Sequence, residues 1–301
     1  MYVRRVDELT LPLARGIIES NVSARARSDF ARSLIGVESV VRVLATPRGY
    51  VRFDTVSFSS EGDLDFLRNG TGAYLGCDAE GIHYVVRFGE GDGSMIALRE
   101  SAGELSATQL AAAVPAAALA AWHATARFCE RCGGPLENAN MGWMKRCSEC
   151  RVDVYPRTDP AMIVAVFDAD GRLLLAHNTA WTAGRVSLLA GYVDAGEAPE
   201  RTVIREVAEE VGIRTAARPK FLGTSPWPFP RSLMLTYRLD LPLSGAEADA
   251  ALLPDECEIA WARFYTRQQL RDAIADGTVS TPSASSVAAR VIERWLEGCE
   301  I

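Results

Sequence analysis

Three glutamates with the spacing of a metal site occur in residues 191–213, which read GYVDAGEAPERTVIREVAEEVGI. In a helix of 3.6 residues per turn, Glu206 and Glu210 lie on one face and Glu209 lies beside them. Carboxylates four residues apart repel each other and weaken a helix. A divalent cation would reverse that cost, because Mg²⁺ prefers oxygen ligands. A metal bound there can polarise a phosphoryl oxygen and activate a water molecule.

The residues around these glutamates predict the helix itself. Pro199 suits the first turn of a helix, and Gly212 suits its end. Aliphatic residues at helical spacing form an adjoining apolar face that can pack into a core: Val203, Ile204, Val207, Ala208 and Val211. The alternative is a solvated acidic face on which Arg205 pairs with Glu209. That alternative would be preferred for an isolated E-x-x-E-E, and the complete pattern described next favours the metal site instead.

The segment resembles a Nudix box, whose pattern is G-x5-E-x7-R-E-U-x-E-E-x-G-U with U aliphatic. All nine specified positions fit: Gly191, Glu197, Arg205, Glu206, Val207, Glu209, Glu210, Gly212 and Ile213. Nudix proteins hydrolyse a diphosphate linked to another group with Mg²⁺ or Mn²⁺. The resemblance implies an α/β (α+β) fold with an α/β/α sandwich, and it implies catalytic roles for Glu197, Arg205, Glu206, Glu209 and Glu210.

Four of the seven cysteines have the spacing of a zinc ribbon. Cys129-x-x-Cys132 and Cys147-x-x-Cys150 are separated by fourteen residues. Four thiolates on two tight turns can hold one tetrahedral Zn²⁺, and a site with four cysteines leaves no open position for catalysis. Two disulfides are the alternative, which a chain without a recognisable signal peptide disfavours. We therefore predict a structural zinc.

A proline-rich segment follows the box, where residues 224–232 read TSPWPFPRS. Its three prolines favour an extended form that would pre-order Trp227 and Phe229 for binding. By itself the segment is equally consistent with a loop whose aromatic residues are tucked into the core. It is similar to the S-Q-P-W-P-F-P-x-S array of NADH pyrophosphatases, and six of the eight specified positions match. Ser225 replaces the glutamine of that array, and Gly142 stands where some relatives have a substrate-contacting glutamate.

The NADH pyrophosphatase resemblance implies further site residues. Divalent metal would be held by Glu206, Glu210 and Glu258 with the backbone carbonyl of Ala190, and Glu209 would be a ligand or the base. The implied substrate contacts are Arg99, Tyr155, Tyr192, Ser225, Pro226, Trp227, Pro228, Phe229, Pro230, Arg231, Ser232 and Ala288. Tyr155 and Tyr192 would stack on the nicotinamide or adenine ring. The alternatives are ordinary half-buried tyrosines and, for Glu258, a solvated charge at a strand end.

Composition places the chain among globular proteins with an acidic balance. It has 301 residues, a net charge of −7 and a sequence pI near 5.2, which does not indicate an overall basic surface for long nucleic acids. The N-terminal stretch has no signal-peptide pattern, and no apolar run is long enough to span a bilayer. We therefore expect a cytoplasmic protein without membrane contact.

The sequence predicts three domains: a β-rich N-terminal domain over 1–127, a zinc ribbon over 128–155 and a Nudix domain over 156–301. Strands are expected at 37–43, 50–53, 73–75, 82–88, 95–98, 162–167, 172–176, 187–190, 233–241 and 259–265. A hairpin turn is expected at Asp170-Gly171 and a hairpin loop at 89–93. Helices are expected at 108–126, 267–275 and 283–297, the last with Ser283 as its N-cap.

Together these features favour an enzyme that cleaves NAD(H) into nicotinamide mononucleotide and AMP. Removal of NAD caps from RNA 5′ ends is also allowed, and the family resemblance implies a homodimer. One alternative keeps the chemistry but changes the substrate to ADP-ribose, a nucleotide sugar or a dinucleoside polyphosphate. Another is a zinc-ribbon module that binds RNA or protein and carries an idle Nudix domain.

Overall fold

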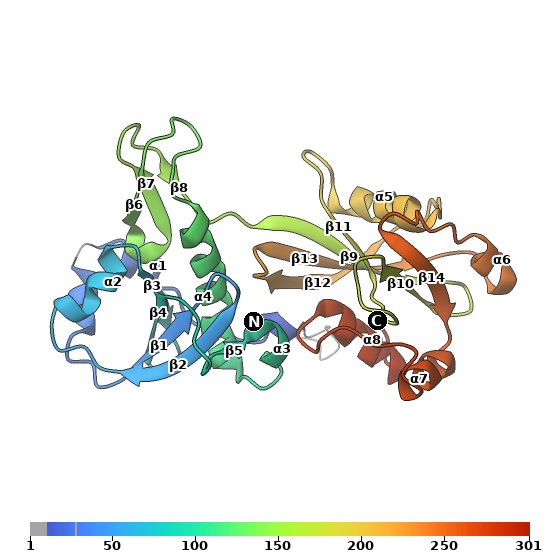
Figure 1. Cartoon of the computed structure of the whole chain (residues 1–301), viewed down its shortest axis with the longest axis horizontal. Helices are drawn as coiled ribbons and strands as arrows, with labels where there is room; N and C mark the ends of the chain where they lie inside the picture. Colours follow the sequence, from blue (N-terminus) through green and yellow to red (C-terminus); the bar gives the residue numbers. More distant parts are fainter. Residues whose placement is uncertain (1–10, 28) are drawn as a thin grey trace, which may run out of the picture. The chain divides into compact units, whose positions relative to one another are not determined.

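The computed structural model describes residues 11–27 and 29–301, so most of the N-terminal stretch assessed for a signal peptide lies outside the described residues. The chain forms two compact units (Figure 1). One contains Asp159–Ser225 and Leu233–Ile301 with the described residues Leu11 and Pro12. The other contains Leu13–Thr158 together with Pro226–Ser232. The expected division at residues 127 and 155 remains a prediction.

The unit containing residues 13–158 is built on a five-stranded sheet. The strands are β1 (Val40–Ala45), β2 (Tyr50–Val56), β3 (Gly72–Cys77), β4 (His83–Phe88) and β5 (Ile96–Ala97). Their order is β3-β4-β1-β2-β5, so the expectation of a β-rich region is confirmed. The expected hairpin at 89–93 is wrong, because β4 and β5 are not neighbours in the sheet and the loop crosses to its opposite edge.

Each face of this sheet is covered by helices. Helix α4 (Ala107–Thr125) packs its alanines and leucines against one face and begins with a capping box between Ser106 and Gln109. Short helical segments cover the other face with a smaller apolar cluster. These and the remaining short helices are η1 (Pro12–Ala14), α1 (Val22–Arg25), η2 (Phe30–Leu34), η3 (Gly62–Leu64), α2 (Asp65–Arg68) and α3 (Leu98–Ser101).

A three-stranded sheet follows α4 in the same unit. It consists of β6 (Leu136–Ala139), β7 (Met144–Cys147) and β8 (Asp153–Val154), with the turn η4 (Asn140–Gly142) between β6 and β7. This turn is held against β3 and α4, because Trp143 donates from its indole nitrogen to the Tyr74 carbonyl at 2.6 Å and His123 bonds the Gly142 carbonyl at 2.8 Å.

The unit of residues 159–225 and 233–301 contains a six-stranded sheet. Its strands are β9 (Asp159–Phe167), β10 (Leu173–Asn178), β11 (Leu189–Tyr192), β12 (Lys220–Trp227), β13 (Ser232–Asp240) and β14 (Ile259–Tyr265). The order is β12-β13-β9-β10-β14, and β11 also pairs with β9. Strand β9 is apolar on both faces: Met162, Val164 and Val166 enter one core, and Ile163, Ala165 and Phe167 enter the other.

Helices cover both faces of this sheet, as an α/β/α sandwich requires (Figure 1). Helix α5 (Pro199–Val211) packs on one face, and α7 (Arg267–Ala275) and α8 (Val287–Leu296) pack on the other. The sequence did not predict the strand over Lys220–Trp227 or the short α6 (Gly245–Ala250). Among the described residues, no helix is both long and apolar enough to cross a membrane.

One expected helix cap is wrong. Helix α8 begins at Val287, and the Ser286 hydroxyl accepts from the Ala289 N–H at 3.1 Å. Ser283 instead begins a turn, since its carbonyl accepts from the Ser286 N–H at 2.9 Å and its hydroxyl contacts that of Ser285. The helix therefore begins about one turn later than expected, after a turn in which Ser285 is buried.

His123 makes the stability of the unit of residues 13–158 depend on pH. Burial lowers the pKa of His123 from 6.5 to about 4. Between about pH 6.5 and pH 4, His123 is therefore protonated in the unfolded chain but neutral in the folded chain. As the pH falls through this interval, proton binding favours the unfolded chain, and the free energy of unfolding decreases. We expect a loss on the order of 2 kcal/mol over this interval.

The matched variant is His123→Gln, whose amide can still donate to the Gly142 carbonyl but does not titrate. Denaturant unfolding of both proteins between pH 7 and pH 4.5 measures the difference. If the free energy of unfolding of the variant depends on pH as that of the wild type does, His123 is not the cause of the pH dependence.

Candidate active site

The box residues are placed by β11 and α5 of the unit of residues 159–225 and 233–301. Helix α5 begins with Pro199 and ends at Gly212, whose φ of 76° is the left-handed geometry of a helix C-cap. The predicted apolar face is confirmed, because Val203, Val207 and Val211 are fully buried against the sheet. This packing fixes the rotation of the helix, and Glu206 and Glu209 therefore lie beside Arg205, which contacts the end of β11.

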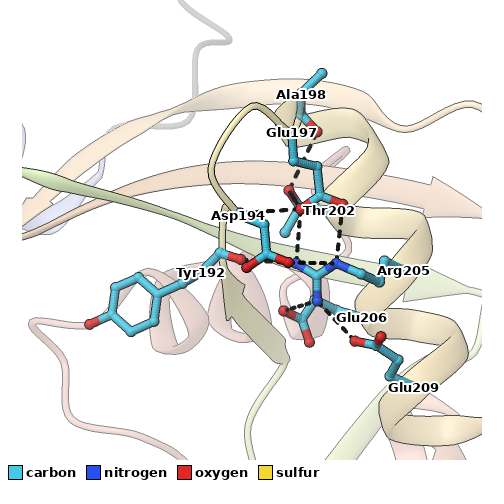
Figure 2. Close-up of polar contacts among 8 residues, drawn as sticks. All are labelled: Tyr192, Asp194, Glu197, Ala198, Thr202, Arg205, Glu206 and Glu209. Atoms are coloured by element: carbon cyan, nitrogen blue, oxygen red, sulfur yellow. Dashed lines mark hydrogen bonds and ion pairs between the residues drawn. The ribbon is translucent and has the colours of Figure 1, made fainter.

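Arg205 connects most of the box (Figure 2). Its guanidinium donates to both carboxylate oxygens of Glu197, at 3.1 and 2.9 Å. It also donates to Glu206 and to Glu209, each at 2.9 Å, and to the Tyr192 carbonyl at 3.0 Å. One cation thus ties the loop to the helix and holds three carboxylates, an arrangement for which the planar fork of arginine is suited.

Glu197 is a fixed anion within this network. Its carboxylate also accepts from the Thr202 hydroxyl at 2.8 Å and from the Asp194 N–H at 3.3 Å. The hydrogen bonds from Arg205, followed by that from Thr202, lower the pKa of Glu197 to about 2. A carboxylate held this firmly is a poor proton acceptor, so its part in the site is to position Arg205.

Glu206 lies directly against the backbone of Gly191. A Cβ atom at position 191 would collide with Oε1 of Glu206, so any other residue there would displace the Glu206 carboxylate. Burial raises the pKa of Glu206, while the hydrogen bond from Arg205 opposes that change. The glycine of the box is therefore explained by a close contact and not by a special φ angle.

Glu210 is the most buried carboxylate of the box. It is 5% exposed, and its buried Oε2 atom has no hydrogen-bond partner. Burial first, and then the charges of Glu206 and Glu258, raise the pKa of Glu210 to about 8. A buried carboxylate oxygen without a donor is costly unless a cation satisfies it. The chemistry of Glu206 and Glu210 therefore fits a divalent metal.

Glu258 comes from the turn that precedes β14. Its carboxylate is exposed and accepts from the Asn178 amide at 3.4 Å. Its backbone N–H donates to both carboxylate oxygens of Asp255, at 3.1 and 3.2 Å, and the Asp255 N–H reaches the Glu210 carbonyl at 3.3 Å. Sequence reasoning missed Asn178 and Asp255. The acidic run from Asp255 to Glu258 was the available signal for the second of these.

The four cysteines form the tightest candidate metal site in the described part of the chain. The sulfurs of Cys129, Cys132, Cys147 and Cys150 all lie within 4.8 Å of one another, and none is in a disulfide. Gly133, with a φ of 77°, forms the first tight turn by donating to the Cys129 carbonyl at 2.8 Å. This set fits a structural zinc, as the cysteine spacing predicts.

The two tyrosines expected to stack on substrate are both exposed on their own units. Tyr192 is 56% exposed at the end of β11, and Tyr155 is 61% exposed just after β8. Ala190 lies in β11 beside the box loop, and Ala288 is buried in the first turn of α8. The substrate contacts of Tyr155, Tyr192 and Ala288, and the metal contact of the Ala190 carbonyl, remain predictions.

The proline-rich segment divides between the two units. Ser225 is buried within β12, whereas residues 226–232 belong to the unit of residues 13–158. There the structure brings Arg99 to the segment, with its guanidinium carbon 5.4 Å from the centre of the Trp227 ring. Trp227 and Phe229 are half-buried, so the segment is partly packed into a core and partly open.

The structure explains why position 142 is occupied by glycine and could not hold glutamate. Its φ is +89°, and a Cβ atom there would lie 2.6 Å from the Gly72 carbonyl oxygen. The ribbon turn therefore approaches β3 more closely than any side chain would allow.

Comparison with known proteins agrees with this geometry. The family model for the "NADH pyrophosphatase zinc ribbon domain" matches residues 124–155, and the model for the "NUDIX domain" matches residues 157–282. The Nudix box therefore lies within a segment that matches the Nudix domain model, and this segment follows one that matches the zinc ribbon of NADH pyrophosphatases.

Curated relatives share both parts. The protein named NAD-capped RNA hydrolase NudC of Mycobacterium bovis (strain BCG / Pasteur 1173P2) is 39% identical over 193 residues, which cover 62% of this chain and 59% of that protein. The protein of the same name from Klebsiella pneumoniae subsp. pneumoniae is 35% identical over 181 residues, covering 60% and 64%. The match thus spans less than two thirds of either relative. A solved NUDIX hydrolase from Nitrosomonas europaea is 18% identical, covers 57% of this chain and 90% of its own, and has a TM-score of 0.38.

The contact of Gly191 with Glu206 predicts a selective effect of a single methyl group. Gly191→Ala is expected to displace the Glu206 carboxylate and to weaken Mn²⁺ binding by about 10–100-fold, as loss of a ligand's support usually does. Gly196→Ala is the control, since that glycine lies in the same loop at a φ of +85° and has no atom within 4 Å of its would-be Cβ. Titration of Mn²⁺ followed by electron paramagnetic resonance measures both variants. Equal affinities in the two variants would contradict the role given to Gly191.

The cysteine cluster predicts about one zinc per chain. Cys132→Ser should lose the metal and lower the melting temperature, because a structural zinc site contributes folding energy directly. Cys257→Ser, an exposed cysteine outside the cluster, is expected to keep the zinc. Elemental analysis and thermal denaturation check both outcomes, and full zinc retention in the Cys132 variant would exclude it as a ligand.

Proposed function

We propose that this protein hydrolyses the central diphosphate of NAD(H), releasing nicotinamide mononucleotide and AMP. The observation that carries the proposal is the buried carboxylate of Glu210, which has an unsatisfied oxygen inside a complete Nudix box. The zinc ribbon of the NADH pyrophosphatase type and the proline-rich segment support this substrate over other diphosphates.

The residues of the box would have different roles in such a reaction. Glu206, Glu210 and Glu258, with the Ala190 carbonyl, would hold Mg²⁺ or Mn²⁺. When bound, such a metal supplies positive charge to the diphosphate oxygens and acidifies water. Arg205 fixes the carboxylates of Glu206 and Glu209 relative to each other, which pre-organises the site at no further cost during reaction.

Glu209 is the box carboxylate best placed to accept a proton from water. It is 59% exposed at its side chain, whereas Glu197 is engaged by Arg205 and Glu210 is buried. A base must reach an attacking water while staying ionised near neutral pH. The hydrogen bond from Arg205 holds the Glu209 carboxylate in place.

Removal of NAD caps from RNA is supported as a second use of the same site. The relatives that match this chain are named NAD-capped RNA hydrolases. With a net charge of −7, the protein would recognise the cap by stacking and not by a broad basic surface. The exposed rings of Tyr155 and Tyr192 are suited to such stacking. We further propose a cytoplasmic homodimer, which the family resemblance supports.

The test is hydrolysis by the purified zinc-loaded protein of NADH, NAD⁺, ADP-ribose and an NAD-capped oligonucleotide, with Mg²⁺ or Mn²⁺. We expect nicotinamide mononucleotide and AMP from NAD(H), and a loss of at least about 100-fold in Glu210→Gln, because its buried carboxylate would be a metal ligand. Asp272→Asn, a surface carboxylate on α7, is the charge control. If ADP-ribose is consumed and NAD(H) is left intact, the substrate is ADP-ribose and not NAD(H). A wild type without hydrolysis of any substrate would favour the binding-module alternative.

A further inference from the structure

Glu258 is held by hydrogen bonds at its backbone N–H, its backbone carbonyl and its side chain. The N–H donates to both carboxylate oxygens of Asp255, at 3.1 and 3.2 Å. The carbonyl accepts from the Thr179 N–H at 2.8 Å, and the side-chain carboxylate accepts from the Asn178 amide at 3.4 Å. Surface loops are in general the more mobile part of a fold, so these bonds restrict an exposed residue that burial does not restrict.

The amide of Asn178 is oriented by its own turn. Its Oδ1 atom accepts from the Ala180 N–H at 2.9 Å, and the Asn178 carbonyl accepts from the Trp181 N–H at 3.0 Å. Because the amide oxygen is occupied by a donor, the amide presents its NH2 group to the Glu258 carboxylate. The direction of this donor is therefore set by the local turn.

A β-bulge lies next to Asn178. Along β10 and β14, His177 pairs with Trp261, but the following residue, Asn178, pairs with Ile259. Ala260 is therefore the extra residue of a bulge, an irregularity that often re-aims side chains beside functional sites. The His177 ring stacks on that of Trp261, with centroids 5.4 Å apart, and supports one side of the bulge. Past the bulge, the chain after β10 contacts the turn before β14.

The turn before β14 is also tied to helix α5. The Asp255 N–H donates to the Glu210 carbonyl at 3.3 Å, and the Ile259 N–H donates to the Asp255 carboxylate at 2.8 Å. Ile259 is buried in the same core as Val211 of α5. The backbone that carries Glu258 is thus fixed to the helix of the box, and the position of its carboxylate depends on the bond from β10.

We propose that Asn178 is a positioning residue that holds the Glu258 carboxylate where it binds the divalent metal of the box. Asp255 and Thr179 fix the backbone of Glu258, and Asn178 fixes its side chain. This inference rests on the proposed function only for the role of Glu258 as a metal ligand. Hydrogen bonds to a metal-binding carboxylate orient it, and their loss typically lowers metal affinity about 10–100-fold. Asn178 acts through Glu258 and is not itself a ligand.

The test is a double-mutant cycle on Mn²⁺ binding, followed by electron paramagnetic resonance in the zinc-loaded protein without substrate. We expect Asn178→Ala to raise the Kd for Mn²⁺ about tenfold, because the Glu258 carboxylate loses its donor. In a Glu258→Ala background, the same change should alter the Kd less than about twofold, since no carboxylate is left to position.

A second variant separates the bond to Glu258 from the turn that contains Asn178. Asn178→Ser keeps an acceptor for the Ala180 N–H but is too short to reach Glu258, so it should raise the Kd as Asn178→Ala does. Thr182→Val, a change at an exposed threonine of the same loop, is the control and should keep the wild-type Kd. Thermal denaturation shows whether the variants are equally folded.

The outcomes separate this inference from the proposed function. An equal rise of the Kd in both backgrounds would overturn the inference, because a loosened turn and not Glu258 would be the cause. An unchanged Kd in Asn178→Ala and Asn178→Ser would overturn it too, and so would an unchanged Kd in Glu258→Ala alone. If the cycle gives the expected result and NADH is not hydrolysed, the proposed function fails and the inference stands.

Discussion

The guanidinium of Arg205 connects the acidic residues of the box, and the local structure depends on its hydrogen bonds. It joins the loop carboxylate of Glu197 to the helix carboxylates of Glu206 and Glu209, and it holds the Tyr192 carbonyl at the end of β11. Without that charge, the loop carboxylate and the two helix carboxylates would repel one another. With it, the loop and the helix keep a fixed relation, and Glu210 is left as the buried carboxylate that a cation must satisfy.

The sheet beneath the box supplies the rigidity that this balance of charges requires. Strand β9 is apolar on both faces, so helices cover it from two sides and its position is determined by two cores at once. Helix α5 is locked by Val203, Val207 and Val211, which sets the direction of its acidic face. Charged groups placed on elements this well packed lose little entropy when they bind a metal or substrate.

Close backbone approach is a second constraint that recurs through the molecule. Gly191 admits the Glu206 carboxylate, Gly142 lets the ribbon turn lie against β3, and Gly49 supports the ring of Phe229. In each place a Cβ atom would separate groups that the structure holds together. These contacts join segments far apart in the sequence, and each is specified by the absence of a side chain.

Local features of this protein could be read from the sequence, because they depend on residues within a few turns of one another. The box spacing determined helix α5 and its acidic and apolar faces, the cysteine spacing determined the ribbon, and alternating apolar runs located most strands. The cap of α8 was misplaced by one turn, because Ser286 and not Ser283 accepts from the backbone N–H of Ala289. Only the tertiary structure showed that Glu210 is buried without a partner, that Asp255 links Glu210 to Glu258, and that residues 226–232 pack with the N-terminal sheet. Burial and long-range contact arise from packing of distant segments, and no local spacing encodes them.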